Sequence, residues 1–214
     1  MFSGLTPTEI TVVIASIVLS LSIHEAMHGF VAHWLGDSTA QDMGRLTLNP
    51  LKHIDAVTTV ILPIIMIFTL GQPFFAAKPV PFNPDRVKHD EFGVALVGLA
   101  GPFTNLLLAA IGAGVFRIIG ASASITVLNC LALFIIVNLG FFVFNMIPFP
   151  PLDGSRLLYA FAPEGLQAVM RQIEAMGFMM ILIFFLVGFQ FIAPAIVNIE
   201  ETLFRILTGV SLGV

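Results

Sequence analysis

Residues 8–35 read TEITVVIASIVLSLSIHEAMHGFVAHWL. No charged residue stands between Ile10 and Ile23, and the stretch exceeds the roughly 20 residues that a helix needs to cross a bilayer. Ionisable side chains then appear within the run at positions 24, 25 and 28. Such side chains are costly inside a membrane and usually mark a functional site. The stretch therefore predicts a spanning helix that carries polar chemistry.

The composition of the whole chain agrees with a membrane protein. Of its 214 residues 57% are hydrophobic and 10% are charged, with a mean hydropathy of +1.00, whereas soluble domains have about 25% charged residues. The net charge of −4 and the lack of a basic patch exclude nucleic-acid binding. A single cysteine, Cys130, excludes a disulfide framework. We expect one integral-membrane domain over 1–214, with a first helix that is retained because no basic signal-peptide region precedes it.

Three further apolar runs are long enough to span, at 92–119, 124–147 and 174–198. The run at 56–71 would give only about 24 Å of helix, and Pro63 interrupts it. The predicted fold is therefore an all-α polytopic membrane protein. It has about four transmembrane helices and a short re-entrant or peripheral hydrophobic segment at 56–71.

Within the first run His24, Glu25 and His28 form an HExxH motif. Residues four apart lie one above the other on a helix, so both imidazoles can bind one Zn²⁺. Glu25 lies beside them and can accept a proton from a water that the metal polarises. The spacing thus predicts two metal ligands and a general base.

A catalytic zinc usually has three protein ligands and a water. His33 faces away from His28 on the helix, and we expect His53 and His89 to be solvated in polar loops. Asp153 follows the third long run, on backbone that prolines and a glycine keep from forming a helix. Such backbone at membrane depth is tolerated where it lines a cavity. Asp153 is the preferred third ligand, and a surface loop position is the alternative.

Three stretches of the chain form a recognisable set: HEAMH at 24–28, GPFTN at 101–105 and NMIPFPPLDG at 145–154. Together they resemble the site-2 protease family of intramembrane zinc metalloproteases. The chain is most similar to the compact prokaryotic branch without PDZ or CBS domains. The sequence departs from that branch after residue 55, where AVTT replaces the frequent Pro-x-Gly-Thr.

The resemblance implies that His24, His28 and Asp153 hold one Zn²⁺ per chain and that Glu25 activates the water. It also implies that Asn145 contacts the substrate or the developing oxyanion. The implied activity is hydrolysis of peptide bonds in or near transmembrane segments, for regulated intramembrane proteolysis or for clearance of signal-peptide remnants. The expected partners are transmembrane-helix substrates and the lipid bilayer, with no nucleic acid.

Two other classes of function stay open at this point. A metal transporter or sensor would use ligands along a path, whereas this sequence has one cluster and a base. An inactive scaffold would not need Glu25. For Asn105 two interpretations remain: a hydrogen bond to backbone freed by Pro102 or to a neighbouring helix, and a place in the substrate cleft.

The metal hypothesis also predicts the topology. His24 lies near the C-terminal end of its helix, and Asp153 lies beyond the C-terminal end of the run 124–147, so the two helices must run in the same direction. This requires that 56–71 does not cross. Loops on the cytoplasmic side are enriched in Lys and Arg. In this topology one side carries Arg45, Lys52, Lys78, Arg86, Lys88, Arg156 and Arg171, and the other carries Arg117 and Arg205. We therefore expect a multi-pass protein of the cell membrane whose active site is nearer the cytoplasmic side.

Overall fold

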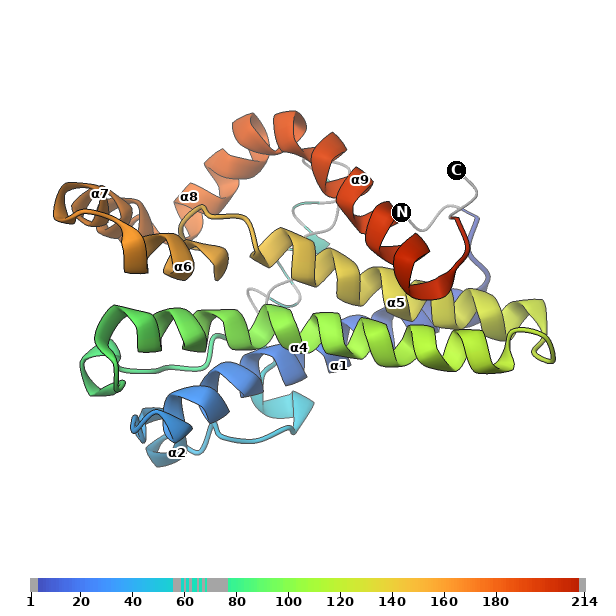
Figure 1. Ribbon diagram of the computed structural model, residues 1–214, viewed down its shortest axis with the longest axis horizontal. Helices are drawn as coiled ribbons and strands as arrows, with labels where there is room; N and C mark the ends of the chain where they lie inside the picture. The colour runs from blue at the N-terminus through green and yellow to red at the C-terminus, as the bar shows by residue number, and fades with distance from the viewer. Residues whose placement is uncertain are drawn as a thin grey trace.

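The computed structural model describes residues 4–55, 59, 61, 63, 64, 66, 68 and 77–211. Its helices over these residues are α1 (Pro7–Trp34), α2 (Thr39–Asp42), η1 (Pro50–Lys52), η3 (Pro84–Arg86), α4 (Asp90–Ile119), α5 (Ile125–Asn145), α6 (Gly154–Phe161), α7 (Glu164–Ala175), α8 (Phe178–Ile183), the π-helical turn η4 (Phe184–Gly188) and α9 (Phe189–Thr208). Figure 1 shows α1, α4 and α5 lying along the long axis of the molecule.

Four helical stretches among the described residues are long and apolar enough to cross a membrane: Pro7–Trp34, Asp90–Ile119, Ile125–Asn145 and Met179–Thr208. This confirms the predicted all-helical, four-span fold. The last span ends ten residues beyond the predicted position 198, because backbone hydrogen bonding continues past the charged pair Glu200 and Glu201. Most of the segment 56–71 lies outside the described residues, so its predicted re-entrant or peripheral path stays a prediction.

Local sequence sets the ends of these helices. Thr6 and Glu9 form a reciprocal capping box at the start of α1, where Pro7 occupies the first turn. The Ser124 side chain accepts a hydrogen bond from the Val127 N–H at the start of α5. Gly209 ends α9 in the left-handed conformation, with φ of 80°.

The helices α1, α4 and α5 pack on one another and form the core, which we call the three-helix bundle. Val13 and Leu21 of α1 pack against Val137 of α5. Ala109 of α4 packs against Ile135 of the same α5. Helix α4 thus has α1 and α5 as neighbours, and these pairings bring the polar residues of α1 next to both.

The chain leaves α1 and enters α4 at the same end of the bundle. The Lys88 N–H donates to the Leu35 carbonyl oxygen over 2.9 Å, and Leu35 packs with Val87 and Val94. The end of α1 and the start of α4 are therefore adjacent. The predicted topology requires this, because in it the residues between them do not cross the membrane. We call this the basic end of the bundle, because the loops that meet there carry Arg45, Lys78, Arg86 and Lys88.

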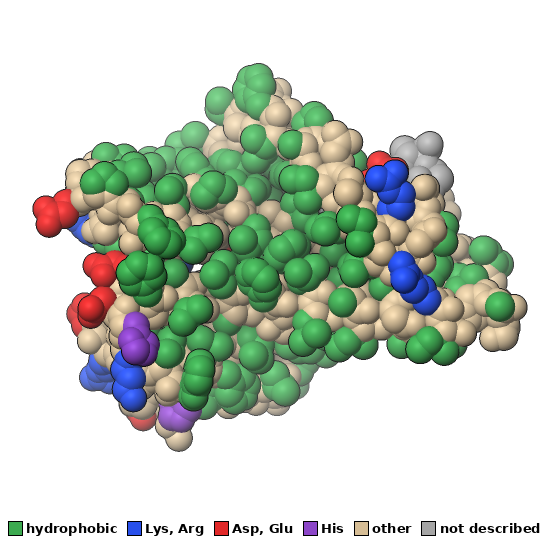
Figure 2. Space-filling model, viewed as in Figure 1, with side chains coloured by type: hydrophobic (Ala, Val, Ile, Leu, Met, Phe, Trp, Pro, Cys, Tyr) green, Lys and Arg blue, Asp and Glu red, His purple; other side chains and the backbone are tan. Residues whose placement is uncertain are grey.

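Residues 178–208 form a bent C-terminal arm, composed of α8, η4 and α9. Figure 1 shows the arm arching away from the bundle and returning across α5. Phe204 is its buried contact in the cluster formed with α4 and α5. In Figure 2 hydrophobic side chains cover the middle of the visible face, while most of its charged and histidine side chains gather at the end that carries α2 and α7. That pattern is the one expected of a protein surrounded by lipid.

Candidate metal centre

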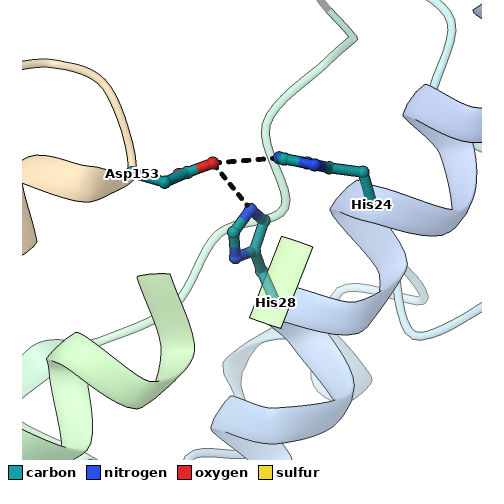
Figure 3. A group of neighbouring side chains, drawn as sticks. All are labelled: His24, His28 and Asp153. Atoms are coloured by element: carbon teal, nitrogen blue, oxygen red, sulfur yellow. Dashed lines mark hydrogen bonds and ion pairs between the residues drawn. The ribbon is translucent and has the colours of Figure 1, made fainter. Parts of the chain in front are cut away.

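Three side chains of the types that bind metal ions meet between α1 and the start of α6 (Figure 3). The Nε2 atom of His24 lies 3.0 Å from Oδ2 of Asp153, and Nε2 of His28 lies 3.5 Å from the same oxygen. One ligand atom from each residue falls within 4.8 Å of the other two. Both histidines are buried. The arrangement is a two-nitrogen, one-oxygen donor set of the kind that suits zinc.

The local sequence explains why the three side chains converge. His24 and His28 are one turn apart on α1, so both rings leave the same face of the helix. Asp153 reaches them because the chain turns back sharply after α5. A Cβ on Gly154 would lie 2.5 Å from the Met146 carbonyl oxygen, so this turn requires a glycine.

The second ring nitrogen of each histidine is bound to an acceptor. Nδ1 of His28 lies 2.7 Å from the Val97 carbonyl oxygen, and Nδ1 of His24 lies 2.6 Å from Oδ1 of Asn105. A carbonyl can only accept, so Nδ1–H of each ring is the donor. This leaves each Nε2 with its lone pair free for a metal, an arrangement typical of zinc-binding histidines.

The orientation of Asn105 is itself fixed by a chain of hydrogen bonds. The Asn138 amide nitrogen donates to the Phe134 carbonyl oxygen over 2.9 Å, and this carbonyl can only accept. The Oδ1 of Asn138 therefore faces Asn105 and accepts from its amide nitrogen over 3.1 Å. The Oδ1 of Asn105 is in turn directed at His24. The proton position on His24 is thus set from the backbone of α5.

Two ring nitrogens and a carboxylate oxygen lie this close only with a positive charge among them, which either protons on the rings or a metal ion can supply. Two imidazoles and one carboxylate are the donor types that bind a divalent cation such as zinc, so the residues present fit a metal ion. Gly101 keeps the space open. A Cβ on Gly101 would lie 2.5 Å from Nε2 of His28 and 2.6 Å from Nε2 of His24.

A cavity of about 500 Å³ opens onto the three ligands. Glu25 and Asn145 also line it, so all five residues predicted from the sequence border one space. Glu25 Oε2 accepts a hydrogen bond from the Val80 N–H over 2.9 Å. The amide nitrogen of Asn145 donates to the Phe141 carbonyl oxygen of its own helix over 3.0 Å. Most of the remaining lining is apolar.

Val80, whose N–H binds Glu25, belongs to a segment that hydrogen bonds hold in place before and after it. The Lys78 N–H donates to the His53 carbonyl oxygen over 2.8 Å, and the Asn83 N–H donates to Asp37 Oδ2 over 2.7 Å. Asp37 is buried, which by itself would raise its pKa. Hydrogen bonds from Thr39 and Asn83 and the nearby positive charge of Arg86 lower the pKa of Asp37 below its usual range. Asp37 is thus a charged anchor for this segment.

The remaining histidines lie away from the ligands. His33 is exposed on the last turn of α1 and His89 is exposed before α4, as expected. The expectation that His53 is solvated is wrong. His53 is buried, with Nε2 2.7 Å from the Thr47 carbonyl oxygen, because its loop folds back against the helix bundle.

The structure also resolves the two interpretations of Asn105. Asn105 is fully buried and contacts a predicted ligand, so it is a positioning residue. The expected hydrogen bond to a neighbouring helix is confirmed, but the sequence did not identify His24 as the partner. The available signal was the position of Asn105 four residues after Gly101, which places both on the face of α4 that meets α1.

Comparison with known proteins gives one matching family model and several curated relatives. The family model is peptidase family M50, matched over residues 113–189. The chain is 37% identical over 179 residues to a Bacillus subtilis protein named "Putative zinc metalloprotease YwhC", covering 80% of this chain and 78% of that protein. It is 30% identical over 171 residues to the similarly named Rip2 of Mycolicibacterium smegmatis, covering 80% of this chain and 65% of Rip2. No solved structure matches the chain.

Proposed function

Because the chain belongs to peptidase family M50 and is an intramembrane zinc metalloprotease, we propose that His24, His28 and Asp153 hold its zinc and that Glu25 is its general base. One observation carries this proposal above all. Three ligand atoms from two distant segments converge within 4.8 Å, beside the glutamate of the same HExxH motif. Asp153 is far from the histidines in the sequence, so the fold brings the three ligand atoms together and local spacing does not.

Zinc held there would supply a Lewis acid that polarises the scissile carbonyl. The chain's own groups do the rest. Glu25 accepts a proton from the attacking water and passes it to the leaving amide nitrogen. The Val80 N–H holds one oxygen of Glu25, which lines the cavity, and the other oxygen remains to accept the proton. Asn145 supplies an amide donor for the developing oxyanion once its hydrogen bond to Phe141 is released.

The cavity suggests the form of the substrate. Its walls are largely apolar and belong to helices of membrane-spanning length. A helical substrate hides its carbonyls in its own hydrogen bonds, so it must unwind locally before water can attack. We propose that the substrates are apolar segments of membrane proteins, cleaved in regulated proteolysis or in clearance of signal-peptide remnants.

We further propose that the active site opens toward the cytoplasm. His24 lies nearer the C-terminal end of α1, which is the basic end of the bundle. Arg45, Lys78, Arg86 and Lys88 belong to this end, and cytoplasmic loops are enriched in such residues. The opposite end holds Arg117, which donates to the Ile206 carbonyl oxygen.

The test is the zinc content of the full chain purified in detergent, measured by mass spectrometry. Wild type should carry about one zinc per chain, and His24→Ala and Asp153→Ala should lose it. His33→Ala, on the same helix but exposed, is the matched control and should keep it. Full zinc in Asp153→Ala would refute the third ligand.

A cleavage assay on reconstituted protein then tests the base. Glu25→Gln should keep its zinc and lose at least about 100-fold in rate, because it removes the proton acceptor and leaves the ligands in place. The same assay separates the other classes of function. A transporter would keep transport in Glu25→Gln, and a scaffold would show no cleavage in wild type.

A further inference from the structure

The cavity that contains the metal centre has a second acidic group, which the mechanism above does not use. Glu200 of α9 lines the same cavity as Glu25 and Asp153. It faces α5 at Gly140: a Cβ on Gly140 would lie 3.8 Å from Oε1 of Glu200. The carboxylate is therefore opposite a position with no side chain, beside open cavity.

Glu200 is half-buried, and it differs from Glu9 and Glu25, whose carboxylates have hydrogen-bond partners. Glu9 accepts from Thr6 and Asn129, and Glu25 accepts from Val80. Arg156, which also lines the cavity, is already paired with Glu174. Within the described part of the chain no hydrogen bond or ion pair reaches the carboxylate of Glu200. Its free oxygens are presented to whatever occupies the cavity.

An unpaired carboxylate in a largely apolar cavity between helices of membrane-spanning length is unfavourable. Its presence is explained if the occupant supplies the missing partner. A carboxylate is best matched by a cation that also donates hydrogen bonds, which is the side chain of lysine or arginine.

We infer that Glu200 is a specificity-determining residue that binds a basic side chain of the substrate segment during cleavage. This inference rests on the proposed function, since it places the substrate in the cavity. It also gives the position of the basic residue. Gly140 and Asn145 are about 7 Å apart along α5, and an extended chain advances about 3.3 Å per residue. The basic side chain should thus be two or three residues from the cleaved bond.

The experiment uses the full chain in proteoliposomes with a series of single-span Leu/Ala peptides whose cut site is mapped by mass spectrometry. Each position within three residues of the cut is replaced in turn by Lys, Leu or Glu, and kcat/KM is measured. At one position wild type should prefer Lys over Leu by about tenfold, the effect of one charged hydrogen bond.

Glu200→Gln should reduce this Lys-to-Leu ratio to near one. Glu200→Lys should shift the preference toward Glu at the same position. The matched control is Glu201→Gln, which removes the neighbouring carboxylate of α9 outside the cavity and should keep the ratio. Zinc content near one per chain verifies that each variant is folded.

Two results would overturn the inference while the proposed function stands: an unchanged ratio in Glu200→Gln, or no position at which wild type prefers Lys. Failure of the proposed function looks different. In that case wild type cleaves no peptide of the series, or Glu25→Gln cleaves as fast as wild type, whatever residue stands at position 200.

Discussion

The three-helix bundle and the C-terminal arm are both strongly apolar but are built in different ways. In both α1 and α4, 44% of the most apolar stretch is buried within the protein, whereas none of the most apolar stretch of the arm is buried. The bundle also contains the buried polar chain from His24 through Asn105 to Asn138. The difference teaches that the hydropathy of a helix shows only that it contacts an apolar medium, which is either lipid or the protein interior. Burial and polar pairing distinguish the helices that carry the candidate metal centre.

The sharpest test of the bundle is Gly101→Ala. The added Cβ would lie within 2.6 Å of both histidine Nε2 atoms, so we expect zinc content to fall from about one per chain to near zero. Gly114→Ala on the same helix meets nothing within 4 Å and is the matched control. Mass spectrometry of the purified variants gives the answer. Full zinc in Gly101→Ala would mean that α4 does not approach the ligands this closely.

A smaller effect is expected at the hydrogen-bonded support of His24. Asn105→Leu removes the acceptor for Nδ1–H and should weaken zinc affinity about 10- to 100-fold in chelator competition. Asn138→Leu acts one bond further away and should weaken it less. Asn129→Leu is the control, because its amide binds Glu9 at the other end of α1. Equal losses in all three variants would indicate general destabilisation of the bundle.

The anchor at the basic end should contribute a moderate amount of stability. Asp37→Asn sets an amide donor against the N–H and O–H donors that now bind the carboxylate, which should lower the free energy of unfolding by about 1–3 kcal/mol. Thermal unfolding in detergent measures this, with the exposed Asp42→Asn as control.

The pH dependence of the same variant follows from the lowered pKa of Asp37. A carboxyl group with a lowered folded-state pKa stabilises the fold fully above its ordinary pKa. That contribution is lost as the pH falls through the folded-state value. The stability difference between wild type and Asp37→Asn should therefore be constant near neutral pH and shrink in acid. A difference that grows in acid would contradict the assignment.

The smallest effect is expected in the arm. Phe191 is 75% exposed, so Phe191→Ala should change unfolding by less than about 0.5 kcal/mol. Phe204 is 2% exposed and packs against α4 and α5, so Phe204→Ala should destabilise more. Thermal unfolding of the pair compares them directly. If Phe191→Ala were the more damaging, the arm would have a packing partner along its exposed length.

Much of this architecture could be predicted from the sequence because membrane helices are specified by length and apolarity. The same holds for the histidine pair, whose geometry depends on helix periodicity alone. Asp153 was predictable because its backbone could not be helical at that depth. These residues carry their information locally.

The remaining features depend on tertiary contacts. The burial of His53 requires its loop to fold back on the bundle, which its polar neighbours do not indicate. The role of Asn105 depends on the register between α4 and α1, and that of Glu200 on where the arm recrosses α5. The helices α6 and α7, which follow Asp153, were not predicted. They are short and mixed in polarity, so hydropathy does not mark them.

The order of the ligands along the chain has a consequence for biosynthesis. His24 and His28 leave the ribosome early, but the Asn105 that orients His24 and the Asp153 that completes the donor set follow much later. A nascent chain with only α1 inserted has the proposed base and two of the three proposed ligands. If the proposed ligand set holds, proteolytic competence arises only after α5 and Asp153 have been made.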